Sequence, residues 1–339
     1  MRYALLLKSH GNIRYVQSLK KLALAELGCI LKAWNIAAMP AVEEIGGAAF
    51  LTFDADDFPP DAWEAVSQHA AIVFAAVREG ALLRPVALSR KNYLPDDVAE
   101  VLKYKGKTNA DFTSTLLHCA RAVSDFAKTA EPLWILDPIC GRGTTLFCAL
   151  QEGHNAIGVE WDTKAVAEAD AYFSRYLKYH KIKHRRTASS LTLPQGGNAK
   201  EVRYFLSNTN QSYREGDGKA LRLITGDTRN AVQMLGEACC HLVVGDLPYG
   251  VQHAPKQGGR MTSFTQLLSE IMPVYRKALK PGGAMALSFN EYTLPRNVVE
   301  QAMEDAGLTV FREAPYEDFS HWVEQAVQRD VVLAKREKK

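Results

Sequence analysis

Ile135-Leu-Asp-Pro-Ile-Cys-Gly-Arg-Gly-Thr-Thr-Leu146 is the stretch of sequence that decides the fold of this chain. Its apolar start predicts a buried strand that ends at Asp137, and Thr144 is the expected start of a helix. Gly141 and Gly143 lack a Cβ, so the backbone between strand and helix can pass close to a bound molecule. The free N–H groups of the first helical turn would face that molecule. This order of elements predicts a site for a nucleotide or nucleoside.

The turn also indicates which ligand it holds. No third glycine completes the G-x-G-x-x-G spacing of nicotinamide-binding turns, and an acid, Asp137, precedes the glycines. An acid suits a ligand with a positive end, and S-adenosylmethionine (SAM) carries a sulfonium and an ammonium. The residues expected to hold SAM here are Asp137, Pro138, Cys140, Gly141, Gly143 and Thr144. The alternative interpretation is an ordinary tight turn between a strand and a helix.

Three later apolar strands also end in acids, at Glu160, Asp227 and Asp246. Open α/β sheets bind ligands at the carboxyl ends of their strands, so these acids are expected to lie along one site. Glu160 could accept both hydroxyls of an adenosine ribose, and Asp227 could accept from the adenine amino group. Trp161 and Thr228 follow these two acids directly and are also candidates for cofactor binding.

The fourth strand runs into Asp246-Leu-Pro-Tyr249, the expected catalytic motif. An exocyclic amine on a base is a poor nucleophile, because its lone pair is delocalised into the ring. The Asp246 carboxylate and the Leu247 carbonyl could hold both N–H groups of such an amine and stabilise the charge that develops on its nitrogen. Pro248 would stiffen the loop, and Tyr249 offers an aromatic face to a base that has left its stack.

With these motifs, the chain resembles the class I SAM-dependent methyltransferases, most closely the tRNA guanine-N2 (position ten) branch of the RNA methyltransferases. The first motif of that branch resembles Asp137–Thr144, and the ending Arg329–Arg336 resembles its last strand. The branch usually has Asp-Pro-Pro-Tyr or Asn-Pro-Pro-Tyr where this chain has Leu247 at the second position. The resemblance implies a Rossmann-like α/β sheet, SAM as cofactor, and N-methylation of an exocyclic base amine in RNA, with guanine-N2 in tRNA leading.

Two other functions stay open at this stage. The first is methylation of adenine-N6 or cytosine-N4 in DNA or RNA. The second is a non-catalytic protein that kept the methyltransferase fold and binds RNA or a partner. The order of the motifs, with the SAM-binding turn first, excludes the permuted DNA methyltransferases.

The first 95 residues predict a small, separate α+β domain. Strands are expected near 3–8, 31–38, 46–53, 71–77 and 81–86, with helices near 16–27 and 59–68, the first of which Gly28 would end. The order βαββαβ suggests a ferredoxin-like sandwich. Residues 96–112 are then a linker, and 113–339 form the methyltransferase domain with an insertion at about 187–218.

Two basic segments are candidates for contact with RNA. The cluster Lys178–Arg186 is expected at the end of the helix after Glu160, where the side chains offered to phosphates are Lys181, Lys183, Arg185 and Arg186. A solvated helix end is the alternative. Lys256 and Arg260 belong to the glycine-containing loop after the catalytic motif, which could order on substrate binding.

The segment Lys103–Thr113 joins the two expected domains and precedes a helix that starts at about Ser114. In the methyltransferases that the chain resembles, this element often closes over the methionine end of SAM. That resemblance places Phe112 and Thr113 at the cofactor. A solvated linker with a helix cap is the alternative.

Composition sets the remaining bounds. The chain has 339 residues and a net charge of +3, so any binding of nucleic acid must come from local patches. Its six cysteines form no C-x-x-C pair, which indicates neither a metal site nor disulfides and fits a reducing cytoplasm. No apolar run is long enough to span a membrane. A small activating partner protein and a homodimer both stay open.

Overall fold

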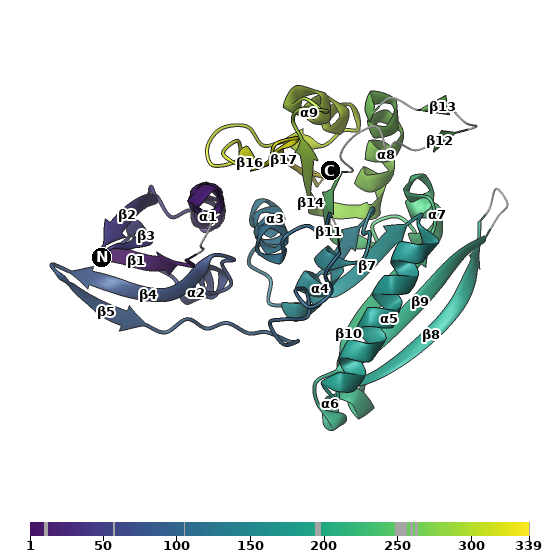
Figure 1. Ribbon diagram of the computed structural model, residues 1–339, viewed down its shortest axis with the longest axis horizontal. Coiled ribbons are helices and arrows are strands. Elements are labelled where there is room, and N and C mark those ends of the chain that lie inside the picture. The colour runs from purple at the N-terminus through teal and green to yellow at the C-terminus, as the bar shows by residue number, and fades with distance from the viewer. Residues whose placement is uncertain are drawn as a thin grey trace.

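The computed structural model describes residues 1–9, 13–56, 58–104, 106–193, 198–247, 256–257, 260–261 and 264–338. They form an N-terminal sheet and a larger C-terminal sheet, which lie next to each other (Figure 1). A separate short ladder joins β12 (Lys256–Gln257) to β13 (Arg260–Met261).

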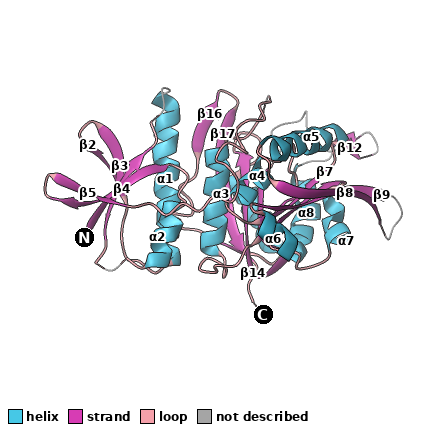
Figure 2. Ribbon diagram, turned by 90° about the horizontal axis from the view of Figure 1, so that it is seen from below, coloured by secondary structure: helices cyan, strands magenta, loops and turns pink. Residues whose placement is uncertain are grey.

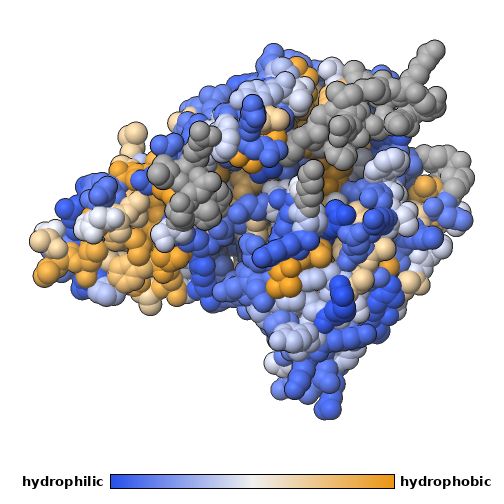
Figure 3. Space-filling view, in the orientation of Figure 1, coloured by the Kyte–Doolittle hydropathy of each residue, from blue (hydrophilic) through white to orange (hydrophobic). Residues whose placement is uncertain are grey.

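The N-terminal sheet is antiparallel, with the order β2-β3-β1-β4-β5. Its elements are β1 (Arg2–Leu7), α1 (Ile13–Ala33), β2 (Ala41–Ile45), β3 (Ala48–Asp54), α2 (Pro60–Ser67), β4 (Ile72–Glu79) and β5 (Leu82–Val86). Alternate strand residues such as Leu5 and Phe53 pack against α1 and α2 in one apolar cluster. Figure 3 shows hydrophobic residues gathered over this end of the molecule, where Leu82 is 73% exposed.

Two sequence predictions in this region are wrong. Gly28 does not end the first helix, because α1 continues to Ala33. A Cβ at Gly28 would lie 2.8 Å from the Cβ of Pro315, so the glycine allows the helix to pack closely against a loop of the C-terminal half. The strand expected at 31–38 is also absent: Leu31 lies on the buried face of α1, and β2 starts only at Ala41.

The C-terminal sheet has a parallel centre with the order β10-β7-β6-β11-β14. Its central strands are β6 (Trp134–Asp137), β7 (Asn155–Glu160), β10 (Lys219–Thr225), β11 (Cys240–Asp246) and β14 (Leu279–Asn290). The antiparallel β17 (Val327–Lys335) lies between β14 and β15 (Thr309–Val310), and it also pairs with β16 (His321–Glu324). The chain leaves β6 toward one edge and later continues from β11 toward the other. This reversal makes a Rossmann-like α/β sheet with a switch point between β6 and β11.

Helices cover both faces of this sheet. They are α3 (Ala110–Val123), α4 (Thr144–Gln151), α5 (Thr163–Tyr179), α7 (Ala231–Leu235), α8 (Phe264–Ala278) and α9 (Arg296–Asp305). Ile135 and Leu242 belong to the apolar cluster that includes α3, α4 and α5, whereas the next residues along the same strands, Leu136 and Val243, belong to the cluster with α7, α8 and α9. This alternation is why the central strands are apolar on both sides.

The predicted insertion is a hairpin that widens the sheet. It consists of β8 (Lys183–Thr192) and β9 (Asn198–Ser207), and a short helix, α6 (Asn210–Glu215), follows. β9 pairs with the edge strand β10, so the hairpin extends the sheet sideways rather than covering the site. The hairpin begins at Lys183, so Lys183, Arg185 and Arg186 lie in a strand. The sequence prediction, which placed them at the end of a helix, is wrong for these three residues.

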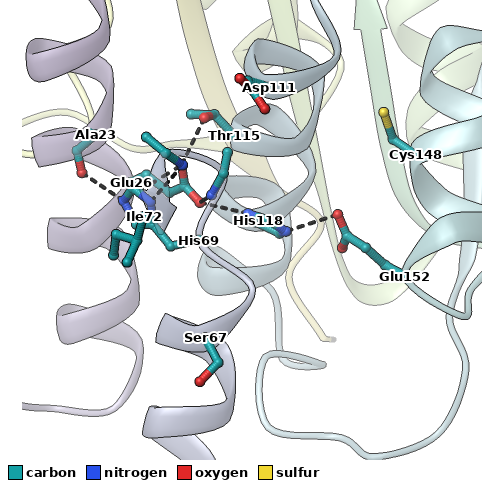
Figure 4. A network of polar contacts seen from close by, with 12 residues as sticks. Ala23, Glu26, Ser67, His69, Ile72, Asp111, Thr115, His118, Cys148 and Glu152 are labelled. Atoms are coloured by element: carbon teal, nitrogen blue, oxygen red, sulfur yellow. Dashed lines mark hydrogen bonds and ion pairs between the residues drawn. The ribbon is translucent and has the colours of Figure 1, made fainter. Parts of the chain in front are cut away.

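The two sheets are joined through α1 and α3, which lie side by side (Figures 1 and 2). Between them runs a buried polar network, drawn in Figure 4. Glu26 on α1 is fully buried, and its carboxylate accepts hydrogen bonds from Thr115 Oγ1 at 2.8 Å and from His118 Nδ1 at 2.6 Å. The other ring nitrogen of His118 faces Glu152 Oε1 at 3.0 Å.

Both nitrogens of His118 face carboxylates, so the ring is an imidazolium. Burial alone would lower its pKa, but Glu152 and Glu26 outweigh burial and raise the pKa of His118 to about 10. Burial likewise opposes the charge on Glu26, yet His118 and the buried His69, whose Nε2 lies 3.8 Å from Glu26 Oε2, hold the pKa of Glu26 at about 2. A buried, charged and fully hydrogen-bonded group therefore connects α1, α3 and the end of α4.

Candidate active site

The glycine turn joins β6 to α4, as the sequence predicts. Asp137 is the last residue of β6, and its Oδ1 accepts a hydrogen bond from the Ile139 N–H at 3.1 Å. Gly141 and Gly143 have φ angles of 52° and 89°, in the left-handed region that glycine adopts without strain. Gly143 is the N-cap of α4, so the helix begins at Thr144 with its free N–H groups at the carboxyl edge of the sheet.

Cys140 packs beneath the turn. Its side chain is buried, and its N–H donates to the Val159 carbonyl at 3.1 Å. A Cβ at Gly158 would lie 2.6 Å from Cys140 Sγ, so the glycine in β7 lets the turn approach the sheet. Pro138 is buried as well. The thiol of Cys140 therefore belongs to the packing under the turn.

Glu160 ties the end of β7 to the glycine turn. Its Oε2 accepts the Gly141 N–H at 3.0 Å, and its Oε1 accepts the Asp162 N–H at 2.8 Å. Each carboxylate oxygen can accept a further hydrogen bond, so these contacts leave capacity for a pair of hydroxyls. Trp161, the next residue in the chain, is 74% exposed, and its ring lies at the surface.

Asp227 follows β10 and binds an arginine that the sequence analysis did not single out. Its carboxylate accepts the backbone N–H of Arg229 at 2.9 Å and pairs with the guanidinium at 2.5 Å. Burial would raise the pKa of Asp227, but Arg229 outweighs burial and lowers it. The Oγ1 of Thr228 lies 2.9 Å from the hydroxyl of the buried Tyr275. Asp227 is thus a charged, oriented carboxylate.

Asp137 is the buried acid of this edge, with 4% of its surface exposed. Burial is the main cause that raises its pKa to about 7, and the negative neighbours Glu160 and Asp246 add to the shift. No basic side chain of the described chain forms an ion pair with Asp137. A buried carboxyl that titrates near neutrality beside a backbone cradle is a candidate for a functional residue.

Asp246 ends β11, and three side chains of the described residues donate hydrogen bonds to its carboxylate. Thr108 Oγ1 donates to its Oδ2 at 2.7 Å, Ser288 Oγ donates to its Oδ1, and Arg329 Nη2 lies 3.3 Å from Oδ2. The Leu247 N–H donates to the Ser288 carbonyl at 2.8 Å. Proline has no N–H, so a proline at position 247 could not make this bond.

The other two residues of the predicted catalytic motif, Pro248 and Tyr249, lie outside the described residues.

The segment before α3 contacts both the glycine turn after β6 and the end of the neighbouring strand β11. The Tyr104 hydroxyl lies 3.2 Å from Thr144 Oγ1 at the glycine turn, and the Arg142 guanidinium lies over the Tyr104 ring at 4.6 Å. Four residues later, Thr108 contacts Asp246. Sequence reasoning placed this segment at the cofactor but missed Tyr104 and Thr108. The available signal was the basic run Lys103–Lys107, in which Tyr104 is the one aromatic residue and which Thr108 directly follows.

Phe112 and Thr113 lie in the first turn of α3, which starts at Ala110 rather than at about Ser114. The Phe112 ring lies 4.7 Å from the Arg329 guanidinium, so it backs the arginine that pairs with Asp246. Thr113 is buried, and its Oγ1 donates to the carbonyl of the N-cap residue Asn109 at 3.0 Å. Their packing thus holds the start of α3 against the site.

The predicted RNA contacts separate into three groups. Lys181, Lys183 and Arg185 are exposed, whereas Arg186 forms a two-pronged ion pair with Asp170 at 2.7–2.9 Å. Lys256 and Arg260 belong to β12 and β13, but their side chains lie outside the described residues. The pairing of Lys183 with Ser207 puts the first group at the amino end of β10, opposite to the edge that carries the acids.

Within the described part of the chain, no group of three or more His, Cys, Asp and Glu side chains could hold a metal ion. None of its helices is both long enough and apolar enough to cross a membrane.

Comparison with known proteins gives the following. No protein-family model matches the chain, and no curated protein matches it. Many of the solved structures that resemble it are SAM-dependent methyltransferases. A SAM-dependent methyltransferase from Agrobacterium tumefaciens is 14% identical, with 67% of this chain and 61% of that chain covered and a TM-score of 0.39.

Magnesium protoporphyrin IX methyltransferase from Synechocystis, solved with bound SAM, is 15% identical over 68% of this chain and 86% of its own, with a TM-score of 0.39. A 16S rRNA N2 methyltransferase from T. thermophilus, in complex with AdoMet and guanosine, is 13% identical over 88% of this chain and 58% of its own, with a TM-score of 0.37. Scores at this level leave the function to be inferred from the residues of this chain.

Proposed function

We propose that this chain is a SAM-dependent N-methyltransferase that acts on an exocyclic base amine in RNA, with guanine-N2 in tRNA as the leading substrate. One observation carries the proposal: Asp227, Glu160, Asp137 and Asp246 follow, in this order, the carboxyl ends of the adjacent parallel strands β10, β7, β6 and β11. Neighbouring strands lie about 4.8 Å apart, so the row is about 14 Å long. An elongated ligand with an adenosine end and a reactive end fits along it.

The residues present suit SAM in three respects. Asp137 is a buried carboxyl with no basic partner among the described residues, as an acceptor for the ligand's ammonium should be. Gly141 and Gly143 form a backbone cradle without side chains at the start of α4. Glu160 would hold the ribose hydroxyls, while Asp227 would hold the adenine amino group.

The same geometry supports a role for Asp246 in methyl transfer. When bound, SAM would supply the methyl group that its positively charged sulfur carries, and the remainder of the molecule would be a neutral thioether. The Asp246 carboxylate, fixed by Thr108, Ser288 and Arg329, accepts an N–H of the base amine and stabilises the charge that grows on its nitrogen. Once the methyl group of SAM has been transferred to the amine nitrogen, Asp246 would take the proton that this nitrogen loses, either directly or through water.

We assign the first 95 residues to a ferredoxin-like domain, which the strand order β2-β3-β1-β4 supports, and residues 113–339 to the methyltransferase domain. Lys181, Lys183 and Arg185 supply cationic contacts for RNA phosphates, because they are exposed at the hairpin. Arg186 contributes less, since Asp170 already holds its guanidinium.

Mass spectrometry of modified nucleosides tests the proposal. RNA from a strain that lacks this chain is incubated with the purified protein and SAM, and the products are compared with those of the Asp246→Asn variant. N2-methylguanosine that appears only with the wild-type protein supports the leading substrate. N6-methyladenosine or N4-methylcytidine instead would move the target to those bases. SAM binding without methylation of any nucleic acid would leave a non-catalytic binding protein.

A further inference from the structure

The widened part of the C-terminal sheet has one face that the active site does not use. In Figure 1, α5 lies in front of β10, so the opposite face of the sheet is turned away from the viewer. On that opposite face, α7 and α8 cover the half near the acids, where Ile224 packs against them. Toward the amino end of β10, the face has a hollow of about 510 Å³, with Trp134, Phe205 and Arg185 in its wall.

The strand register explains the hollow. Arg185 pairs with Phe205, Phe205 pairs with Ala220, and Trp134 pairs with Asn155, whose Oδ1 accepts the Ala220 N–H at 2.8 Å. These five residues therefore form one row across five strands. Adjacent strands are about 4.8 Å apart, so Trp134 and Phe205 stand about 14 Å apart with two short side chains between them. Two aromatic residues thus border a shallow floor.

The charge of this hollow is positive. One row further along the strands, Arg203 and Arg222 pair with each other across β9 and β10, and both hold the buried Glu201, at 2.7 and 2.6 Å. Arg185 is exposed and forms no ion pair within the described part of the chain. The wall of the hollow thus carries three arginines, two of which share one buried acid, so its net charge is positive and complements a polyanion.

We propose that this hollow is a platform for single-stranded RNA, in which an unpaired base stacks on Phe205 or Trp134 while phosphates contact Arg185 and Arg203. The inference rests on the proposed function and names a second contact for the same substrate. Aromatic side chains on an open sheet suit splayed bases, because every base has a flat face to stack, whereas a duplex hides its bases. An acidic peptide would use the arginines but has no need of the aromatic walls.

The platform lies apart from the reaction site. Asn155 begins β7 and Glu160 ends it, five residues further on, which corresponds to about 17 Å along the strand. RNA on the platform is therefore held by nucleotides that flank the target in the folded substrate, and not by the methylated base itself. This separation means that binding to the platform can be measured without SAM and without catalysis.

The test is the binding of a fluorescein-labelled 12-nucleotide oligouridylate to the full chain, followed by fluorescence anisotropy at several salt concentrations. Arg185→Gln should weaken binding and reduce the slope of log K against log salt by about 0.7, the value for one lost phosphate contact on a single strand. Phe205→Leu keeps an apolar side chain, and it should weaken binding about tenfold without changing the slope. Arg175→Gln, an exposed arginine on α5 across the sheet, is the matched control and should bind like wild type.

Wild-type affinity and slope in both Arg185→Gln and Phe205→Leu would overturn the platform. A 12-base-pair duplex that binds as tightly as the oligouridylate would also overturn it. Polyglutamate that binds as tightly as the oligouridylate, with an affinity that Phe205→Leu does not change, would overturn it too and would indicate an acidic protein partner. Methyl transfer to RNA is assayed separately. If the protein methylates RNA but the platform variants bind the oligouridylate like wild type, the platform is wrong and the proposed function stands. If the protein methylates no RNA but the platform variants bind more weakly, the proposed function is wrong and the platform stands.

Discussion

The guanidinium of Arg329 lies 3.3 Å from the Asp246 carboxylate and stacks on the Phe112 ring at 4.7 Å. Asp246 is the last residue of the central parallel strand β11, whereas Arg329 lies on the antiparallel strand β17 near the C-terminus of the chain. The Arg329 side chain is 8% exposed, whereas the Asp246 side chain is 20% exposed, so the arginine lies behind a carboxylate that a substrate can reach. A carboxylate held by an arginine, a serine and a threonine is fixed in orientation before any substrate arrives. Such preorganisation is what electrostatic stabilisation of a transition state requires.

Asp246→Asn should abolish most of the activity and leave SAM binding intact. The amide keeps the size of the side chain but removes the negative charge, so kcat should fall about 10²-fold or more. Single-turnover transfer of labelled methyl groups measures the rate, and calorimetry measures the SAM affinity. Asp305→Asn, an exposed acid on α9, is the control and should match wild type. A variant that transfers methyl groups at the wild-type rate would remove Asp246 from the reaction.

Arg329 is expected to act through Asp246. Arg329→Gln removes the cation and should lower kcat by about 10- to 100-fold, which corresponds to the loss of a charged hydrogen bond of about 1.5–3 kcal/mol. Arg329→Lys keeps the charge and should recover part of that loss. A purely structural role predicts the opposite pattern: both variants would melt at a lower temperature, and kcat below the melting temperature would stay at the wild-type value.

SAM affinity should depend on pH through Asp137. Burial raises the pKa of this carboxyl to about 7, so the free protein holds a proton there below neutrality. The ligand's ammonium requires the ionised form, and affinity should therefore be constant above pH 7 and weaken up to about tenfold per pH unit below it. Calorimetry from pH 5.5 to 8.5 measures this slope, and proton release on binding near pH 6 should accompany it. Asp137→Asn should show a weaker and flat profile, and a flat wild-type profile would contradict the assignment.

The sequence predicts the central sheet well because its signals are local. Four of the five central strands, β10, β7, β6 and β11, are short apolar runs with an acid at or just after the carboxyl end, and the glycines at 141 and 143 stand at positions where a left-handed turn needs them. Gly28 misled for the opposite reason. Its role is contact with Pro315, far away in sequence, and nothing in the local pattern distinguishes a glycine kept for close packing from one that ends a helix.

The site itself was only partly predictable. Asp137, Glu160, Asp227 and Asp246 could be found because each follows an apolar strand. Their partners Thr108, Arg229 and Arg329 could not, since a threonine or arginine in a polar stretch has no pattern of its own until the fold brings it to a carboxylate. The hairpin shows the same limit. The alternation that places Arg185 and Arg186 on opposite faces appears only when the segment is known to be a strand.

The last prediction concerns the network that joins the two sheets. Loss of the His118 charge removes the cation that contacts both Glu26 and Glu152, so His118→Gln should cost about 3–5 kcal/mol of unfolding free energy at pH 6. The wild-type contribution has a defined pH window. The pKa of His118 is about 10 in the folded state and 6.5 ordinarily, so its stabilisation is complete below pH 6.5 and is lost as pH rises toward 10.

Glu26 sets the acid side of that window. Its pKa is about 2 when folded against an ordinary 4.5, so its stabilisation is complete above pH 4.5 and is lost as pH falls toward 2. Urea denaturation from pH 3 to 9.5 measures the free energy of unfolding. The contribution of this network to that free energy in the wild-type protein should be largest between about pH 4.5 and 6.5. His118→Gln should remove the decline between pH 6.5 and 9.5, whereas His180→Gln, a partly exposed histidine at the end of α5, should retain it. If His118→Gln and wild type lose stability in parallel over that interval, the imidazolium does not join the two sheets, and the buried charge on Glu26 must be held by another group.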